Sequence, residues 1–243
     1  MSTLELEHLK HSSASGNNIT LAADGSLSKI HVKSAASGAT ADASADELVV
    51  EGSGNTGITI ASGASSSGSI YFADSGSAYD GWINYSQTDR KLNFATAQTT
   101  RMSIDANGAV TKPNNPGFYA RHTTARVYTN GYLYDFTITW EQGGSNLATA
   151  TGIYTAPASG VYQVNLMLGN QYNSGAGNYK IYVNNTYYNG FTFDGIDNQS
   201  GWVTSTLCGL IKINANDTVR IWCNSTGHPD NSDWSAWSMY MVG

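Results

Sequence analysis

The side chains best able to bind or react with a ligand gather in three polar segments of the second half of this 243-residue chain. These segments run 170–178, 194–202 and 226–234, and they contain no Lys or Arg. Aromatic rings cover the apolar C–H patches of a sugar while polar groups take its hydroxyls, so a mixture of rings, amides and carboxylates favours glycan recognition. The candidate binding residues are Tyr172, Asn173, Asp194, Asp197, Asn198, Trp202, His228, Asp230, Asp233 and Trp234. For Trp202 and Trp234 the alternative is inward packing at a strand end, because each ring has a large area to bury.

The four carboxylates of these segments allow two sharper interpretations. Calcium prefers oxygen ligands, but the spacing of Asp194, Asp197, Asp230 and Asp233 is unlike any compact calcium loop. Glycoside cleavage needs two carboxylates at a defined separation in a cleft, one of them with a raised pKa. Solvated charges explain the residues more simply, so we predict no cofactor and keep calcium as the alternative.

Other catalytic arrangements have weaker support. From residue 116 onward the chain has only His122 and His228, and it has no Gly-x-Ser-x-Gly elbow. No paired Cys or His spacing supports zinc. The glycines at 52–57 match a dinucleotide-binding pattern, but that chemistry needs a helix to follow, whereas residues 58–60, Ile-Thr-Ile, predict a strand. We therefore predict a protein that is not an enzyme.

Charge and hydropathy exclude two classes of partner. The net charge is −6, and the Lys and Arg residues are spread singly, so no basic run could follow a phosphate backbone. No segment approaches the roughly 20 apolar residues that cross a bilayer, and the first ten residues lack the apolar core of a signal peptide. We expect no nucleic acid partner, no membrane insertion and synthesis in the cytosol.

Residues 116–243 predict an antiparallel β-sandwich. Of the six tryptophans only Trp82 precedes residue 115, and twelve of the fifteen tyrosines follow it, so the main core lies in this half. Pro113 and Pro116 mark a rigid junction before it. Apolar residues then alternate with polar ones in runs typical of half-buried strands, and no amphipathic helix competes. The runs are Phe136–Trp140, Val161–Leu168, Tyr179–Val183, Val203–Ile213, Val219–Cys223 and Ser235–Met241.

The connections between these runs alternate in length. Tight turns at Asn184–Asn185 and Asn214–Asp217 separate the three long polar segments. Antiparallel strands reverse direction each time, so the long segments should meet at one end of the sandwich and the tight turns at the other. Loops on a rigid scaffold are a usual place for recognition, which makes the long-loop end the predicted binding tip.

The head also resembles a known family. The run from Gly152 to Val164, GIYTAPASGVYQV, resembles the signature of the complement-globular-head and tumour-necrosis-factor-like family, as do Ile211–Ile221 and the closing run Trp237–Met241. The resemblance implies a ten-strand jelly roll that trimerises, binds ligands without transforming them and has its long loops distal to the stem. Asn216 and Met239 stand where the family has glycine; Asn tolerates a left-handed backbone, whereas Met239 has no such explanation.

The two cysteines depend on strand register. If Ile211 pairs with Ile221 across a hairpin, as the family pattern implies, Gly209 faces Cys223 and Cys208 lies on the other face. A slip of one residue would instead place the cysteines opposite each other and permit a disulfide. We predict two free, mostly buried thiols, in line with cytosolic assembly.

Residues 21–115 predict a repetitive stem of short strands. The segment is rich in Gly, Ser, Ala, Thr and Asn, and a weak repeat of an apolar pair followed by a glycine turn starts at Ile19, Ile58 and Met102. Such strands bury too little to order alone. A disordered linker is one outcome, but the regular Ile and Val placement favours apolar faces shared between identical copies around an axis.

This half resembles the stems of tail fibres from tailed phages. The resemblance lies in Glu47–Gly54, Gly68–Asp74 and Arg101–Gly108. With the head, it implies an all-β homotrimer in three parts: a virion-anchoring segment 1–20 with Leu4, Leu6 and Leu9 as an apolar edge, a stem 21–115 and a jelly-roll head 116–243. A frayed terminus explains residues 1–20 equally well.

The function implied is a virion fibre or tail appendage, assembled in the host cytoplasm, whose head binds a host-surface receptor, either a glycan or a protein. Three alternatives remain open. The chain could be a structural or decorative virion protein, such as a capsid fibre or cement trimer. It could be an enzyme that degrades surface polysaccharide, or a secreted adhesin of the same fold.

Overall fold

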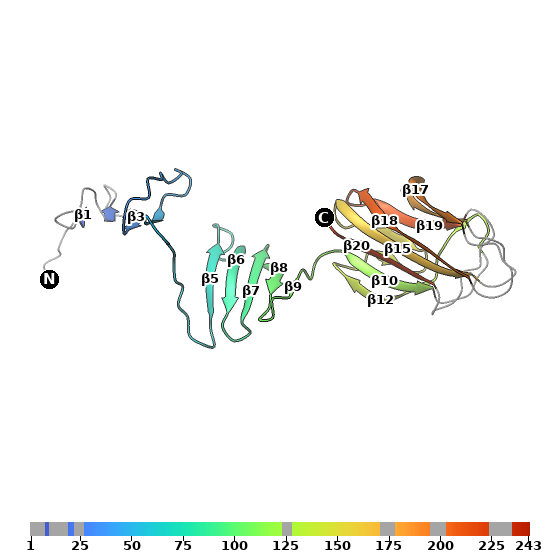
Figure 1. Cartoon of the computed structure of the whole chain (residues 1–243), viewed down its shortest axis with the longest axis horizontal. Helices are drawn as coiled ribbons and strands as arrows, with labels where there is room; N and C mark the ends of the chain where they lie inside the picture. The colour runs from blue at the N-terminus through green and yellow to red at the C-terminus, as the bar shows by residue number, and fades with distance from the viewer. Residues whose placement is uncertain are drawn as a thin grey trace. The chain divides into compact units, whose positions relative to one another are not determined.

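The protein is all-β, as predicted. The computed structural model describes residues 8–9, 19–21, 27–122, 128–170, 178–194, 203–223 and 235–243. Every regular element among them is a strand (Figure 1). No helix in these ranges is long and apolar enough to span a bilayer. The chain divides into two units, Met1–Ser69 and Ile70–Gly243, which are described separately below.

The first unit contains a four-stranded sheet in the order β1-β2-β3-β4. The pairing of β3 with β4 is parallel, and it places Lys33 beside Glu51. Residues 52–66, which follow β4, contain no strand and no helix. The strands are β1 (His8–Leu9), β2 (Ile19–Leu21), β3 (Leu27–Lys33) and β4 (Leu48–Glu51).

The predicted strand at residues 58–60 is therefore wrong. Ile58 and Ile60 are 66% and 47% exposed, and the segment that holds them pairs with no other strand of the described chain. An alternating apolar pair is too little to hold a strand when no neighbour supplies the ladder hydrogen bonds. The glycines at 52–57 precede no helix, as expected from the sequence.

Five antiparallel strands form a second sheet in the order β5-β6-β7-β8-β9. The glycine turn predicted after Met102 is present: Gly108 has φ of 85°, and Oδ1 of Asp105 accepts hydrogen bonds from the backbone N–H groups of Asn107 and Ala109. Side-chain capping of this kind stabilises a turn locally. The strands are β5 (Ser67–Phe72), β6 (Gly81–Ser86), β7 (Lys91–Thr96), β8 (Thr99–Ile104) and β9 (Val110–Thr111).

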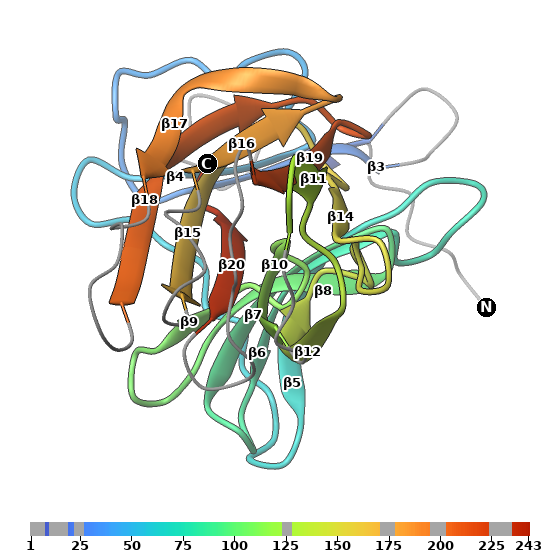
Figure 2. The ribbon, with the colours of Figure 1, turned by 90° about the vertical axis from the view of Figure 1, so that its right-hand side faces the viewer.

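The head, residues 117–243, is a jelly roll of two antiparallel sheets. The first sheet has the order β12-β10-β20-β15-β18, and the second has the order β13-β14-β19-β16-β17 with β11 also paired to β19. Figure 2 shows the two layers of strands facing each other. The strands are β10 (Gly117–His122), β11 (Gly131–Tyr132), β12 (Phe136–Gln142), β13 (Leu147–Ala148), β14 (Ile153–Thr155), β15 (Gly160–Asn170), β16 (Asn178–Val183), β17 (Thr186–Asp194), β18 (Val203–Ile213), β19 (Thr218–Cys223) and β20 (Ala236–Met241).

The core fills the space between these sheets. Alternation is clearest in β19, which buries Val219, Ile221 and Cys223 and leaves the residues between them partly exposed. Rings interlock at the centre, where Phe118 meets Trp237 edge to face at 4.9 Å between centroids. Such contacts add to the hydrophobic gain of burying the rings. The largest fully buried side chains are Trp237, Tyr154, Tyr162, Tyr179, Phe118, Leu133, Leu166, Leu168, Ile181, Ile211, Ile221 and Met239.

Each predicted run of the head forms a strand with nearly the predicted bounds. The predicted tight turn at Asn184–Asn185 is also present, with φ of 49° and 63°, values that suit Asn in a two-residue hairpin. The predicted hairpin between the strands that contain Ile211 and Ile221 is wrong: β18 pairs with β15, and β19 pairs with β16. The turn at residues 214–217 passes from one sheet to the other.

This sheet crossing corrects the reasoning about the cysteines but not its main conclusion. Ile211 and Ile221 do share the core, yet they approach it from opposite sheets. Neither Cys208 nor Cys223 forms a disulfide, as predicted, but only Cys223 is buried and Cys208 is exposed. The second thiol is exposed because residue 208 lies on the outer face of the first sheet, two places from the exposed Leu210.

The family-like signature residues have clear structural roles. Gly152 has φ of 62°, and a Cβ there would lie 2.0 Å from the carbonyl oxygen of Leu133, so no side chain fits. Asn216 adopts φ of 70°, as expected for Asn in place of glycine. Met239 is fully buried in the core, so its side chain fills space in the sandwich where the family pattern has none.

Candidate functional site

The predicted tip residues lie outside the described residues, apart from the backbone of Asp194, which ends β17. The strand ends that lead to them are described. Asn170 pairs with Val203 in the first sheet, and Asn178 pairs with Asp194 in the second. The three long segments therefore start and finish at the same end of each sheet, which agrees with the predicted alternation. The assignment of individual tip residues to a binding site stays a prediction.

The other end of the head receives the chain from residue 116. The side-chain amide of Asn115 donates to the carbonyl of Met241 at 2.6 Å, and the N–H of Met241 donates to the carbonyl of Pro116 at 2.9 Å. Gln142 donates to the carbonyls of Lys112 and Asn115. These bonds fix the junction beside the C-terminal strand, as the resemblance implied, and opposite the end with the long segments.

The outer face of the second sheet carries a cluster that sequence reasoning missed, which we call the aromatic–cation patch. Strand register places its members in two adjacent rows: Lys180, Trp222 and Tyr132 across β16, β19 and β11, and Tyr187, Tyr182 and Arg220 across β17, β16 and β19. All six residues are partly exposed. They alternate with core residues along each strand, so the patch is the outward-facing half of the same period-two pattern.

The rings of the patch pack against one another. Tyr132 meets Trp222 edge to face at 4.7 Å between centroids and meets Tyr182 edge to face at 5.8 Å. Tyr182 also contacts Trp222 at 5.7 Å and Tyr187 at 6.1 Å. The hydroxyl of Tyr132 donates to Oδ1 of Asn185 at 3.3 Å. These contacts hold the rings in fixed orientations, which lowers the entropy lost when a ligand stacks on them.

Two cations lie over these rings. The guanidinium carbon of Arg220 is 3.6 Å from the centroid of Tyr132, and Nζ of Lys180 is 5.4 Å from that of Tyr187. Arg220 also donates from Nη2 to the carbonyl of Thr151 at 3.1 Å. Partial burial raises the pKa of Tyr132 and lowers the pKa of Arg220, while each group's charge opposes that effect on the other. The guanidinium of Arg220 stays charged at neutral pH because an arginine pKa lies far above 7.

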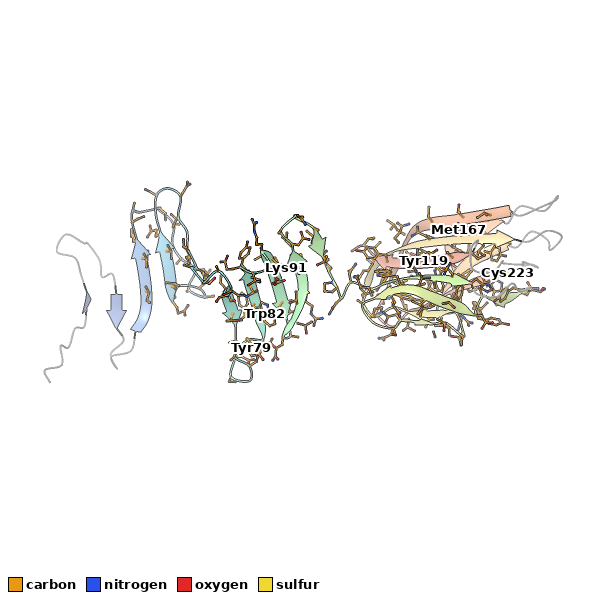
Figure 3. The ribbon with its side chains drawn as sticks, turned by 90° about the horizontal axis from the view of Figure 1, so that it is seen from below. Tyr79, Trp82, Lys91, Tyr119, Met167 and Cys223 are labelled. Atoms are coloured by element: carbon orange, nitrogen blue, oxygen red, sulfur yellow. The ribbon has the colours of Figure 1, made fainter. Side chains whose placement is uncertain are left out.

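The outer face of the first sheet carries a group of exposed aromatic rings among polar and charged residues such as Arg121 and Lys212. Tyr119, Trp140 and Tyr240 are 38%, 45% and 43% exposed, and they lie on neighbouring strands around Gly117. A Cβ at Gly117 would lie 2.9 Å from the ring of Tyr240 and 3.3 Å from that of Trp140, so only glycine lets these rings close over the strand. Beside them Tyr119, Met167, Cys208 and Ser238 help to line a shallow cavity of about 320 Å³ (Figure 3).

The five-stranded sheet β5–β9 has one apolar face. Register places Ile83 beside Phe94 and Met102, and Tyr85 beside Leu92 and Ile104. The face continues to Val110 on β9, which pairs with Ile104, and to Phe72 on β5. A Cβ added at Gly81 would lie 3.7 Å from the Cβ of Phe72, which places Phe72 on the same face as Gly81 and Ile83. Period-two alternation adds Ile70 to the same face. The apolar face is thus Ile70, Phe72, Ile83, Tyr85, Leu92, Phe94, Met102, Ile104 and Val110.

The opposite face of this sheet is polar. Asn93 donates to Asn84 across the strands at 3.3 Å, and the hydroxyls of Ser103 and Thr111 are 2.8 Å apart. Tyr71 and Trp82 are the large rings on this side, and Trp82 contacts Tyr79 at 6.2 Å (Figure 3). Among the strand residues of the sheet only Gly81, Ala95 and Ser103 are buried, so its large apolar side chains stay partly in water.

A charged cluster in the first unit surrounds Glu51. Its carboxylate lies 2.9 Å from both Nζ of Lys33 and Nε2 of His31, and it accepts hydrogen bonds from the N–H and hydroxyl of Ser37. These bonds, chiefly the one from the backbone of Ser37, lower the pKa of Glu51 to about 2. The cluster borders a cavity of about 710 Å³. Its hydrogen bonds tie the loop after β3 to the end of β4, which is a structural role.

Within the described residues we identify no side-chain cluster suited to catalysis or to metal binding. His122 is fully buried, and its Nε2 lies 2.8 Å from the hydroxyl of Tyr128, which donates to the carbonyl of Tyr134. It therefore belongs to the packing of the core. Within the described ranges no group of three or more His, Cys, Asp or Glu could hold a metal ion. Asp197, Asp230, Asp233 and His228 lie outside those ranges, as does the side chain of Asp194.

The comparisons with known proteins concern the fold. No family model matches the chain, and no curated protein matches it. Over about half its length the chain is similar to solved globular domains. The globular domain of zebrafish complement 1qA shares 12% identity, with a TM-score of 0.41 over 53% of this chain and 98% of that one. Eiger TNF from S. frugiperda shares 12% identity, with a TM-score of 0.42 over 53% and 94%.

Murine APRIL is similar at 8% identity, with a TM-score of 0.41 over 52% of this chain and 99% of that one. Likeness at this level concerns chain fold alone. The jelly-roll assignment itself rests on the strand order of the two sheets of this chain.

Proposed function

We propose that the chain is the subunit of a homotrimeric virion fibre or tail appendage whose head binds a receptor on the host surface. It acts by binding and not by catalysis. The observation that carries the proposal is the apolar face of the sheet β5–β9, because a one-layer sheet with one apolar face needs a partner to cover it. A stem built from such sheets gains that partner from identical copies of the chain.

The apolar face suits contact with itself. Its nine residues include no charged side chain, so copies can approach without bringing like charges together. Ile70, Phe72 and Val110 are 49%, 58% and 57% exposed in the single chain, which leaves apolar area to remove from water. Removing apolar area from water contributes roughly 25 cal/mol for each Å².

The outer face of the first head sheet supports the same assembly. Exposed aromatic residues concentrated on one face are typical of protein–protein interfaces. Tyr119, Trp140 and Tyr240 form such a group, with the uncharged residues Asn165 and Ser238 on the neighbouring strands β15 and β20. A trimer formed through this face would leave the second sheet and the long-segment end of each head free.

Receptor binding is supported by the way the chain connections are divided between the two ends of the head. The junction with residues 112–116 and the C-terminal strand share one end, and the long polar segments leave from the other. A head held at the first end presents the second to its surroundings. The sequence-based prediction assigned the candidate binding residues to that end.

The proposal is tested by attachment and by location. Purified full-length chain added to host cells before infection should compete with the virus for attachment, and an antibody against the head should label the ends of fibres in electron micrographs. An unrelated trimeric β-protein at the same concentration is the control. Labelling of the capsid surface without any competition would support a decorative protein and contradict receptor binding.

A further inference from the structure

We propose that the aromatic–cation patch is a binding site for carboxylate-bearing glycans, such as polymers of uronic or sialic acids. The inference rests on the proposed function, because it names the surface and the ligand class through which the head would recognise a host. The aromatic–cation patch is a different surface from the long polar segments. For those segments we predicted a glycan ligand without specifying its charge.

The first argument is geometric. The patch has two adjacent rows of three residues, offset by one strand, on the four paired strands β17, β16, β19 and β11, so its rings and cations keep fixed spacings. Adjacent strands lie about 4.8 Å apart and alternate residues on a strand about 6.7 Å apart. An array of this size matches one or two sugar rings. The edge-to-face contacts of Tyr132 and Trp222 keep the side chains from collapsing onto the sheet.

The second argument is charge. In the described parts of the chain neither Lys180 nor Arg220 forms a salt bridge. Lys180 lies over the ring of Tyr187, and Arg220 lies over the ring of Tyr132. The whole chain has a net charge of −6, so two cations without carboxylate partners on one small surface need an explanation. A carboxylate on a ligand would supply the missing anion through charge-assisted hydrogen bonds.

The third argument combines the two groups of side chains. Tyr and Trp faces bind the C–H side of a sugar ring, which a simple anion lacks. Lys180 and Arg220 distinguish an acidic sugar from a neutral one. The acidic chain disfavours nucleic acid, since a long polyanion would meet net repulsion beyond the patch. Rings and cations together therefore select a sugar with a carboxylate.

The fourth argument is accessibility. The patch is on the outer face of the second sheet, and the face proposed for trimer contact is on the outer face of the first, so the sandwich separates them. Figure 2 shows β16, β17 and β19 in one layer and β10, β15 and β20 in the other. A trimer would present three copies of the patch, which multiplies the apparent affinity for a polymer.

The test measures binding of polygalacturonate and polysialate oligomers to the full-length protein by titration calorimetry. Two comparison ligands separate sugar from charge: the same polygalacturonate with its carboxylates methyl-esterified, and polyglutamate. At least one acidic glycan should bind at least tenfold more tightly than both comparison ligands. Equal binding to polyglutamate, or no binding to either acidic glycan, would overturn the proposal.

Variants assign the binding to the patch. Lys180→Gln should weaken acidic glycan binding at least tenfold, and Tyr182→Ser should do the same by removing the central ring. Lys91→Gln is the matched control, because it makes the same charge change on a partly exposed strand residue of the sheet β5–β9. Equal loss in Lys180→Gln and Lys91→Gln would refute the site.

The attachment assay separates this proposal from the proposed function. If wild-type protein blocks attachment and Lys180→Gln blocks it equally well, the patch proposal fails while the receptor-binding function stands. If the protein binds acidic glycan through the patch but never blocks attachment, the patch is a glycan site and the attachment function fails.

Discussion

The adjacent residues Tyr71 and Phe72 offer a sharp test of the stem, because both are 58% exposed and they point to opposite faces of β5. Burying a whole Phe side chain contributes about 1.5–3 kcal/mol. The exposed 58% of Phe72 therefore contributes roughly 1–1.7 kcal/mol for each chain if copies cover it. Three chains together give about 3–5 kcal/mol, which is roughly 100- to 4000-fold in the trimer association constant.

The variants Phe72→Ala and Tyr71→Ala are compared by sedimentation equilibrium over a range of protein concentrations. Phe72→Ala should lower the association constant by the factor above, and Tyr71→Ala should leave it within about threefold of wild type. Thermal unfolding of both variants shows whether the monomer stays folded. Equal association constants for the two variants would refute the assignment of the apolar face as the contact surface.

Three further predictions concern the fold itself. Gly152→Ala should destabilise the head by at least about 2 kcal/mol in urea unfolding, because the added Cβ would lie 2.0 Å from the carbonyl oxygen of Leu133. Gly190→Ala should cost only about 1 kcal/mol, because Gly190 has φ of 87° but open space around its Cα. Equal losses of stability in the two variants would contradict the predicted clash. Cys223 should react with maleimide only after unfolding in a Cys208→Ser background, because its thiol is buried, and rapid labelling of the native protein would contradict this. Because the pKa of Glu51 is lowered in the folded state to about 2, its stabilising effect is complete above about pH 4.5 and is lost as the pH falls through 2; hydrogen exchange of β3 and β4 should show this loss in the wild type and not in Glu51→Gln.

The sequence was most informative at turns, where a positive φ restricts which residue types can occupy a position. Asn184 and Asn216 both have positive φ, and each could be placed in a tight turn from its type and neighbours. The long strands of the head were predictable for a similar reason, since a buried face forces strict alternation. For the six long runs of the head, strand existence and bounds therefore followed from local pattern.

Strand partners did not follow from local pattern. The runs around Ile211 and Ile221 look like two arms of a hairpin, but β18 and β19 join different sheets. A short turn is compatible with either arrangement, and only the packing of distant strands such as β15 and β16 decides between them. The same limit explains residues 58–60, which alternate like a strand but have no partner strand.

The aromatic–cation patch was missed because its members are far apart in the chain. Tyr132, Lys180, Tyr187 and Trp222 come from four strands, and only their register brings them together. A partial signal was present, since Lys180 with Tyr182 and Arg220 with Trp222 are spaced by two residues. Outward positions that are aromatic or cationic, and not simply polar, point to a surface with a ligand.

The mass of the intact protein in solution tests the account most directly. Multi-angle light scattering after size-exclusion chromatography should give three times the 25.8 kDa of one chain at micromolar concentration. A well-folded species of 25.8 kDa under the same conditions would mean that the apolar face of β5–β9 needs no copies to cover it, and the fibre assignment would fail with it.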